Sequence, residues 1–406
     1  MKLFAAFLLA LLPIPASAAP CTGPVCNLES LRPYFAKLEA ARGEGRQRPV
    51  HILQIGDSHT AGDVLTGGWR ELLQAQYGDG GRGVLPPGRP YDGYFTRGVT
   101  ATMSPGWQVA ATFGKGSTPR NPMLGVSGFA ITNMVPDAMI GLTADPAMAF
   151  DRFVLCAMAG IRAESVTVRT ADGDRAIDLV SDIAEPRCAT LEFASPQTSV
   201  KVVADHGPVT ITSWATFHDN GGVALSNVGI VGSQLLHLGR TADDVLAEEF
   251  KAYSPDLIVL AFGTNEGFGP TIDAAAIEKM LRAQIARLRS ISGDAPILLL
   301  GAPDALSRNP ALRGGAVNCR TIPGVAPVFP PPGLAQVRAV QRKVAGDLGV
   351  AFWDWQARMG GTCFAQRWVN RMPPLMRGDY VHFTTPGGIA LARMLQDDLN
   401  HAAQGQ

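Results

Sequence analysis

Apolar runs that alternate with helical periodicity constrain the fold of this chain most strongly. Residues 257–262 and 297–301 are almost continuously apolar, as strands buried on both faces of a parallel sheet are. Residues 51–56 form a similar run, and each run is followed by apolar residues at helical spacing, for example over 277–288. This alternation predicts an α/β fold in which helices cover both faces of a parallel sheet.

The chain changes character from about residue 91 to residue 220. Helical periodicity gives way to short β-like runs, and residues 171–174 have the composition of a hairpin turn. Regularly spaced strands with turns between them predict an all-β sandwich or jelly-roll module. We therefore expect an inserted β-rich domain over 91–220, between two parts of one α/β domain over 19–90 and 221–406.

The segment 1–18 has the composition of a secretory signal peptide. Lys2 precedes an apolar run that is too short to span a bilayer comfortably, and Ala16-Ser17-Ala18 supplies the small residues of a cleavage site. We expect cleavage after Ala18 and export from the cytoplasm. An uncleaved membrane anchor is the alternative.

The cysteine pattern fits an exported chain, in which six cysteines suggest three disulfides. Proximity in the sequence favours three pairs: Cys21–Cys26, Cys156–Cys188 and Cys319–Cys363. Six cysteines nevertheless allow fifteen connectivities. The sequence has no Cys-x-x-Cys pair and no Cys/His cluster with metal-ligand spacing, so we expect neither a metal site nor a cofactor.

The charge balance narrows the classes of partner. Charged residues make up 17% of the chain, and its formal net charge is +0. Such a chain has no long-range attraction to nucleic acid or to an anionic membrane. Neutral polymers such as polysaccharides remain open as partners.

The first candidate for chemistry is Gly56-Asp57-Ser58-His59-Thr60, between the first apolar run and a helical pattern. Parallel-sheet enzymes bind ligands at the carboxyl ends of their strands, so a serine here can project its hydroxyl into a cleft. Its backbone N–H would lie near a helix N-terminus, which favours the negative charge of an oxyanion. Ser58 is therefore a candidate nucleophile. The alternative is that Ser58 and Thr60 only cap the helix.

Two later segments carry matching chemistry. Asn265 follows the 257–262 strand, where its side-chain amide can donate a hydrogen bond to a developing oxyanion. Asp379 lies three residues before His382, so its carboxylate can orient the imidazole and stabilise the imidazolium. The alternatives are an ordinary turn asparagine and a surface histidine with an unrelated aspartate.

Taken together and in this order, the three segments resemble the signature of the SGNH hydrolase superfamily. The resemblance implies a three-layer α/β/α fold and metal-free hydrolysis of acyl esters. It assigns Ser58 as the nucleophile, His382 as the general base and Asp379 as the group that orients the base.

The same resemblance implies an oxyanion hole with three donors. These would be the Ser58 N–H, the Asn265 amide and a glycine N–H from a loop between the first and last motifs. Gly232 fits this place best, with Gly229 as a near competitor.

A narrower resemblance rests on residues 56–63 and 77–83, which look like those of exported peptidoglycan O-acetylesterases of Gram-negative bacteria. These enzymes also carry a β-rich insertion, as expected here over 91–220. The resemblance implies a periplasmic or secreted serine esterase that removes O-acetyl groups from peptidoglycan, or a related polysaccharide, through an acetyl-enzyme. Three alternatives remain open: an exported polysaccharide O-acetyltransferase with the same triad, an acetylxylan-type esterase, and a non-catalytic glycan-binding protein.

Aromatic side chains of the expected insertion offer platforms on which sugar rings can stack: Trp107, Phe113, Trp214 and Phe217. The simpler interpretation is that each belongs to the core of a β-sandwich.

Overall fold

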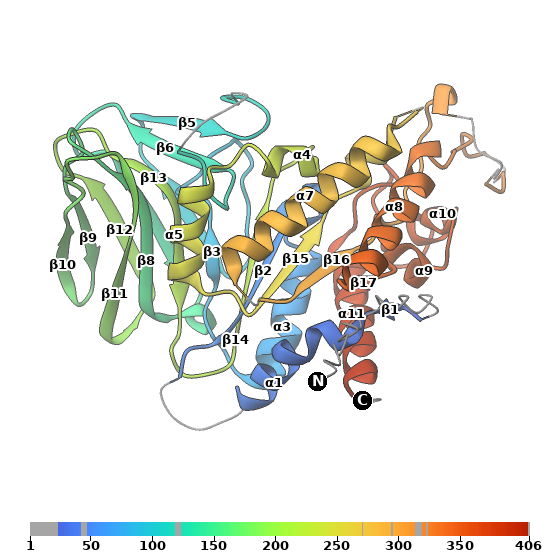
Figure 1. Ribbon diagram of the computed structural model, residues 1–406, viewed down its shortest axis with the longest axis horizontal. Coiled ribbons are helices and arrows are strands. Elements are labelled where there is room, and N and C mark those ends of the chain that lie inside the picture. The colour runs from blue at the N-terminus through green and yellow to red at the C-terminus, as the bar shows by residue number, and fades with distance from the viewer. Residues whose placement is uncertain are drawn as a thin grey trace, which may run out of the picture.

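The computed structural model describes residues 23–41, 47–117, 123–269, 271–293, 295–312, 319–321 and 324–404. The expected signal peptide and Cys21 lie outside these residues. Figure 1 shows two parts, a helix-rich α/β part that contains both ends of the described chain and an all-β part beside it.

The α/β part is built on a six-stranded sheet with strand order β1-β17-β16-β15-β2-β14. The strands are β1 (Val25–Cys26), β2 (Val50–Gly56), β14 (Val223–Gly229), β15 (Leu257–Ala261), β16 (Ile297–Leu300) and β17 (Ala351–Trp353). Every pair is parallel except β1–β17. The apolar runs are thus the central strands of a parallel sheet, and all seven residues of β2 are buried.

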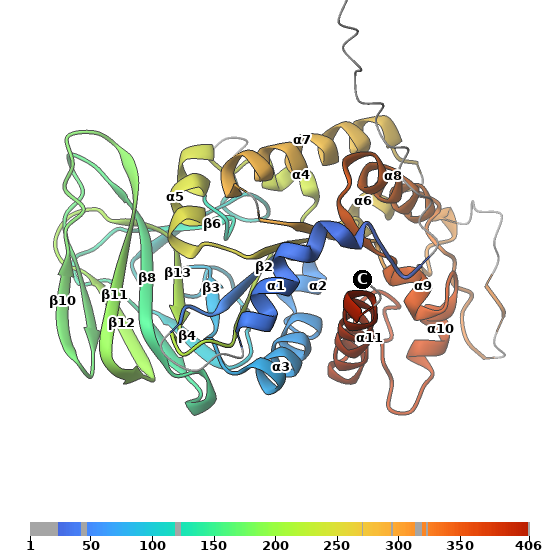
Figure 2. The ribbon, with the colours of Figure 1, turned by 60° about the horizontal axis from the view of Figure 1, so that its bottom comes forward.

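Helices cover both faces of this sheet, as the sequence predicts. One face carries α1 (Arg32–Ala40), α3 (Leu65–Tyr77) and α11 (Thr385–Gln404), and the other carries α5 (Asp243–Tyr253), α7 (Ala274–Ser292) and α8 (Pro332–Leu348) (Figure 2). Neighbouring strand residues point to opposite faces, so Ile52 joins one core and Leu53 the other. The result is the expected three-layer α/β/α arrangement.

Shorter helices connect these elements. The α-helices are α2 (Ser58–Ala61), α4 (Leu235–Leu238), α6 (Thr264–Gly267), α9 (Trp355–Met359) and α10 (Phe364–Val369). The 3-10 helices are η1 (Leu28–Leu31), η2 (Pro146–Met148) and η3 (Pro310–Leu312). No helix in the described part of the chain combines the length and apolar character needed to cross a membrane.

The all-β part consists of two antiparallel sheets, with orders β10-β9-β12-β7-β4 and β11-β8-β13-β6-β5; β3 also pairs with β13. The strands are β3 (Gly83–Leu85), β4 (Val99–Met103), β5 (Trp107–Ala111), β6 (Phe129–Asn133), β7 (Met139–Ala144), β8 (Phe150–Ala159), β9 (Val166–Thr170), β10 (Gly173–Ile177), β11 (Glu185–Gln197), β12 (Ser199–Ala204) and β13 (Thr210–Phe217).

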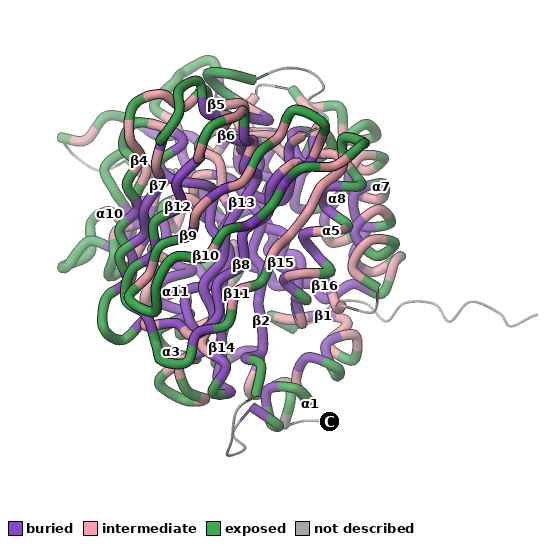
Figure 3. The backbone as a smooth tube through the Cα atoms, turned by 90° about the vertical axis from the view of Figure 1, so that its left-hand side faces the viewer, coloured by how far each residue is buried: buried purple, intermediate pink, exposed green. Residues whose placement is uncertain are grey.

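The two antiparallel sheets share one core and so form a sandwich. Val168 and Val202 from one sheet pack with Phe153 and Trp214 from the other. Strand β10 at the sheet edge is largely exposed, whereas β8 further in is buried (Figure 3). The predicted turn at 171–174 lies where β9 turns into β10.

Two of the three expected disulfides are present between described cysteines. Cys156–Cys188 joins β8 to β11, and Cys319–Cys363 joins the loop after β16 to the start of α10. The expected Cys21–Cys26 pair includes a residue outside the described part.

A buried cluster of charges ties the β part to the start of the α/β part. The Asp63 carboxylate accepts hydrogen bonds from Arg70 Nη2 at 3.0 Å, Thr66 Oγ1 at 2.6 Å and the Arg97 N–H at 2.8 Å. It also accepts one from Arg82 Nη2 at 3.3 Å. Burial alone would raise the pKa of Asp63, but Arg70 and Arg82 hold it well below its usual range.

The same cluster reaches the segment that carries Ser58. The Asn227 side chain on β14 accepts a hydrogen bond from Arg82 and donates one to the Thr60 carbonyl oxygen at 3.0 Å. Arg97 lies two residues before β4 of the sandwich. The cluster therefore fixes α2 and the entry into the β part relative to each other.

Replacing Asp63 with alanine is expected to destabilise the protein strongly. The change leaves Arg70 and Arg82 buried without their carboxylate, a defect that costs about 3–5 kcal/mol in proteins. The measurement is the free energy of unfolding from urea titration.

Asp174→Ala is the matched control, because Asp174 pairs with Arg169 at the surface, where both side chains are more than half exposed. Such a pair contributes at most about 1 kcal/mol. Equally small losses of unfolding free energy in the two variants would show that the Asp63 cluster does not stabilise the contact between α2 and the β part.

Candidate active site

Three strands end level with one another at the edge of the sheet where the candidate residues gather. Gly56 of β2 is in register with Gly229 of β14 on one side and Ala261 of β15 on the other. The loops that carry Ser58, Gly232 and Asn265 therefore leave the sheet at the same edge, as parallel strands require. Gly56 is needed for this closeness, because a Cβ there would lie 2.6 Å from the Ala261 carbonyl oxygen.

The structure brings Ser58, His382 and Asp379 into one hydrogen-bonded line. His382 Nε2 lies 3.0 Å from Ser58 Oγ, and His382 Nδ1 lies 2.9 Å from Asp379 Oδ2. Ser58 begins the short helix α2, whose N-cap Asp57 accepts a hydrogen bond from the His59 N–H at 2.9 Å. This is the geometry of a hydroxyl, a base that can take its proton, and a carboxylate that orients the base.

A tight turn sets the carboxylate against the ring. Tyr380 adopts a left-handed backbone conformation with φ of 62°, and Asp379 Oδ1 accepts the N–H groups of Val381 and His382, each at 2.9 Å. Partial burial would raise the pKa of Asp379, but these N–H groups and His382 lower it below its usual value. Asp379 thus favours its ionised form, as a carboxylate that orients the ring requires.

His59, beside the candidate nucleophile, joins the two loops of this line. Its Nδ1 lies 3.2 Å from Asp57 Oδ1, and its Nε2 lies 3.0 Å from the Val381 carbonyl oxygen. A carbonyl oxygen only accepts hydrogen bonds, so Nε2 carries a proton, while Nδ1 also lies 3.5 Å from the Thr264 hydroxyl oxygen. Burial disfavours the charged form of the ring, yet Asp57 and the Val381 carbonyl outweigh burial and raise the pKa of His59.

Sequence reasoning assigned His59 no role. Its partner Val381 is 322 positions away in the chain, so the contact leaves no local signal. The His59 ring connects the Ser58 loop to the loop that ends in His382.

The candidate oxyanion residues lie together in neighbouring loops. Gly232 has a φ of 79°. Asn265 Nδ2 donates a hydrogen bond to the carbonyl oxygen of Ser233, the residue after Gly232, at 2.8 Å. Gly229 has a different position: it ends β14, where a Cβ would lie 2.3 Å from the Ala61 nitrogen. Gly229 thus lets α2 lie against the strand, and Gly232 is the glycine within the loop.

Glu266, for which the sequence predicted no role, connects the loop after β14 to the loop after β15. Its carboxylate accepts the Leu235 N–H at 2.7 Å and the Gly263 N–H at 3.0 Å. Burial raises the pKa of Glu266 to about 7 despite these two donors. The acidic residue three positions after Gly263 is a helix-capping pattern, which is the one local signal of this role.

A cavity of about 430 Å³ opens at Ser58 and His382. Tyr91 and Phe95, from the segment that leads into the sandwich, and Val231 from the loop after β14 form its apolar wall. Among the described residues, no three His, Cys, Asp or Glu side chains are grouped so that they could hold a metal ion.

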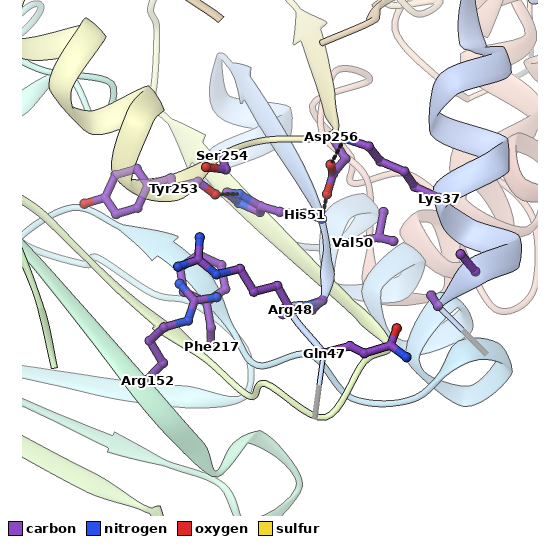
Figure 4. A pocket seen from close by; sticks show the side chains of 13 residues that line it. Lys37, Gln47, Arg48, Val50, His51, Arg152, Phe217, Tyr253, Ser254 and Asp256 are labelled. Carbon is purple, nitrogen blue, oxygen red and sulfur yellow. Dashed lines mark hydrogen bonds and ion pairs between the residues drawn. The ribbon is translucent and has the colours of Figure 1, made fainter. Parts of the chain in front are cut away.

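A second cavity of about 250 Å³ lies at the opposite edge of the parallel sheet, beside the first residues of β2 (Figure 4). Its charged Lys37 is paired with Asp256 at 2.5 Å, and the His51 ring is bonded to the Tyr253 carbonyl oxygen at 2.9 Å. Burial lowers the pKa of His51 to about 4, which keeps this ring neutral. The described residues around this cavity include no activated nucleophile.

Comparisons with known proteins bear on the family and the fold. Residues 204–388 match the family model of GDSL-like lipases and acylhydrolases, a range that contains Gly232, Asn265, Asp379 and His382 but not Ser58. Among curated proteins, none matches the chain.

Solved structures include similar proteins. One described as a peptidoglycan O-acetylesterase in action is 27% identical, covering 95% of this chain and 100% of that chain with a TM-score of 0.77. An acetyl xylan esterase is 21% identical, covering 43% of this chain and 80% of its own with a TM-score of 0.31. A family two carbohydrate esterase from Cellvibrio japonicus is 15% identical, covering 74% and 98% with a TM-score of 0.27.

The fold and the family match define the class: the chain is a carboxylic ester hydrolase. Within that class, residues 204–388 match the GDSL-like lipases and acylhydrolases, and the chain resembles a peptidoglycan O-acetylesterase along nearly its whole length.

Replacing His59 with glutamine is expected to destabilise the protein more in acid than in alkali. Because the folded-state pKa of His59 is raised, the stabilisation from its charge is complete below about pH 6.5 and is lost as the pH rises through the folded-state pKa. Urea unfolding at about pH 5.5 should show a loss of about 1–3 kcal/mol relative to wild type, and a smaller loss at about pH 9.

Asp57, Asp379 and His382 are the titratable groups near this ring, and all three are retained in the variant. His206→Gln is the control, because His206 is exposed in the turn between β12 and β13. If the His59→Gln variant lost more stability as the pH rises, the charged form of the His59 ring would not be the stabilising one.

Proposed function

We propose that this hydrolase removes O-acetyl groups from peptidoglycan or a related cell-wall polysaccharide through an acetyl-enzyme. The observation that carries the proposal is the likeness to a peptidoglycan O-acetylesterase, which extends over 95% of the chain and so includes the β-sandwich as well as the α/β part. The Ser58–His382–Asp379 line supplies the chemistry that such an activity needs.

In the first half-reaction, Ser58 Oγ attacks the carbonyl carbon of the acetyl ester while its proton passes to His382 Nε2. The ionised Asp379 stabilises the imidazolium through Nδ1. The Ser58 N–H, the Gly232 N–H and the Asn265 amide donate hydrogen bonds that stabilise the negative charge developing on the carbonyl oxygen. The C–O bond to the sugar then breaks, and the sugar oxygen takes the proton from His382.

In the second half-reaction, water replaces the sugar. His382 Nε2 takes a proton from the water as its oxygen attacks the acetyl carbon of Ser58. The bond to Ser58 Oγ breaks, the serine regains its proton from His382, and acetate leaves. The groups named are all protein side chains or backbone N–H groups, so the cycle as proposed needs no cofactor.

We place this activity outside the cytoplasm, in the periplasm or secreted. The expected signal peptide supports export, and two disulfides between described cysteines fit an oxidising compartment. The partner is then an O-acetylated cell-wall glycan.

Replacing Ser58 with alanine is expected to lower acetate release from O-acetylated peptidoglycan by about 1,000-fold or more, because the nucleophile is removed. Acetate release is measured with peptidoglycan and with acetylated xylan side by side. Ser290→Ala is the control, since Ser290 lies exposed on α7 and bonds only the Arg287 carbonyl oxygen.

Retained activity in the Ser58 variant would refute the proposal. Faster release from xylan than from peptidoglycan would assign the acetylxylan alternative. If the wild type transfers acetyl to added chitooligosaccharide in preference to water, the protein is an acetyltransferase with the same nucleophile.

A further inference from the structure

The cavity beside the first residues of β2 is separate from the acyl site. It has a volume of about 250 Å³ and is lined by residues of α1, β2, β8, β13 and the end of α5 (Figure 4). Strand β2 runs from Val50 at this cavity to Gly56 beside Ser58, a length of about 20 Å. Because Arg48 and Arg152 both line it, we call it the arginine cavity.

Arg152 presents hydrogen-bond donors that no described group of the protein accepts. Its side chain is only 4% exposed, and its Nε donates to Asp219 Oδ2 at 2.8 Å and Oδ1 at 3.0 Å. The buried Phe217 ring lies against the guanidinium, with the Arg152 Cζ 4.3 Å from the ring centroid. Among the described residues Nη1 and Nη2 have no acceptor, so they offer up to four N–H donors to the cavity.

Arg48 enters the same cavity from the residues that precede β2. Figure 4 shows the side chains of Arg48 and Arg152 pointing toward one another. Arg48 forms no ion pair and no side-chain hydrogen bond within the described part of the chain. Asp219 offsets the charge of Arg152 at Nε, but nothing described offsets the charge of Arg48. Two guanidinium groups that face each other repel, and an anion between them removes the repulsion.

The other charged side chains of the lining are already paired. Lys37 Nζ lies 2.5 Å from Asp256 Oδ1, and Asp256 Oδ2 accepts the His51 N–H at 2.8 Å. Burial lowers the pKa of His51 to about 4, so that ring adds no charge. Asp256 is the one carboxylate among the described lining residues, and its pairing with Lys37 leaves no anion of the lining for Arg48.

We infer that the arginine cavity binds a phosphate group between Arg48 and the Nη atoms of Arg152. A terminal phosphate has three oxygens and can accept paired hydrogen bonds from both guanidinium forks, whereas a carboxylate has only two oxygens. The cavity is smaller than the roughly 300–1,000 Å³ of sites for drug-sized ligands. Its ligand is therefore inorganic phosphate or a small phosphate ester.

Such a ligand connects the two parts of the protein on the side opposite the acyl site. Arg152 belongs to β8 of the sandwich, and Arg48 lies two residues before β2 of the parallel sheet. A phosphate held by both side chains stabilises this contact, and it binds the folded protein only. Phosphate should therefore raise the melting temperature of the protein.

Isothermal titration calorimetry of the full chain with inorganic phosphate, glucose 6-phosphate and nitrate, at constant ionic strength, tests the inference. Arg48→Gln removes one guanidinium and leaves the Arg152–Asp219 pair in place. Arg162→Gln is the matched control, because Arg162 is exposed between β8 and β9 and has no partner among the described residues. We expect Arg48→Gln to weaken phosphate binding about tenfold or more, and the control to leave it unchanged.

The two phosphate probes distinguish the sources of the ligand. Binding of inorganic phosphate that is as tight as that of glucose 6-phosphate, or tighter, assigns free phosphate. Tighter binding of glucose 6-phosphate assigns a phosphate ester. A phosphate affinity that Arg48→Gln leaves unchanged, or that is no stronger than the affinity for nitrate, would overturn the inference.

A charge reversal tests the repulsion between the two arginines without a ligand. Arg48→Glu places a carboxylate opposite Arg152, so it should raise the melting temperature in phosphate-free buffer and abolish phosphate binding. The control Arg162→Glu should change neither quantity. An unchanged or lower melting temperature of Arg48→Glu would contradict the inferred repulsion.

The Ser58→Ala protein separates this site from the acyl site. Because the arginine cavity lies at the other end of β2, this variant should bind phosphate as tightly as the wild type, whether or not the wild type releases acetate. Loss of phosphate binding in Ser58→Ala would place the anion at the acyl site. That result would overturn the inference and leave the proposed function standing.

Discussion

The site depends on one geometric constraint, the level ends of three neighbouring parallel strands. Because β2 lies between β14 and β15, the loop after β2 is placed beside two other loops that come from much later in the chain. The strand register thus places the loops of Ser58, Gly232 and Asn265 side by side. Gly56 and Gly229 permit this closeness, since a side chain at either position would collide with a neighbouring backbone.

The fourth loop, which carries Asp379 and His382, is not held by the sheet and needs its own attachment. Packing of α11 on α3 positions it coarsely. His59 then fixes it through a hydrogen bond to the Val381 carbonyl oxygen. Asp63 fixes the other side of α2 to the segment that enters the β-sandwich. Buried polar and charged groups connect these loops through hydrogen bonds and ion pairs. Because they are buried, removing one partner destabilises the protein strongly.

The sandwich is consequently more than an appended binding module. It supplies Trp107 and Phe113 to the lining of a cavity of about 610 Å³, and its entry segment supplies Tyr91 and a backbone donor to Asp63. Phe113 lies against the loop of Gly232, so the sandwich also contacts a loop of the candidate active site.

The sequence was sufficient to predict the features that have local signals. Apolar runs such as 257–262 predicted central strands, and turn residues predicted the sandwich. The order of motifs located Ser58, Asn265 and His382, which the structure brings to one edge of the sheet. Their catalytic roles stay predictions.

Contacts between distant residues had no such signal. The local partners of His59 and Asp63, such as Asp57 and Thr66, do not distinguish them from ordinary helix-start residues, and their other partners Val381 and Arg82 come from other parts of the fold. Likewise, Trp107 and Trp214 are equivalent by residue type. The three-dimensional position of each strand decides that the Trp107 side chain lines a cavity and the Trp214 side chain is part of the core.

The central claim is that Ser58 carries the acetyl group during turnover. Mixing the wild-type enzyme with excess acetylated substrate, quenching in acid within the first turnovers and mapping the digested protein by mass spectrometry tests this most directly. We expect one acetyl group per chain, on the peptide that contains Ser58, and its disappearance as substrate is consumed. Acetyl on a different residue, or full turnover without acetylated enzyme at any quench time, would contradict it.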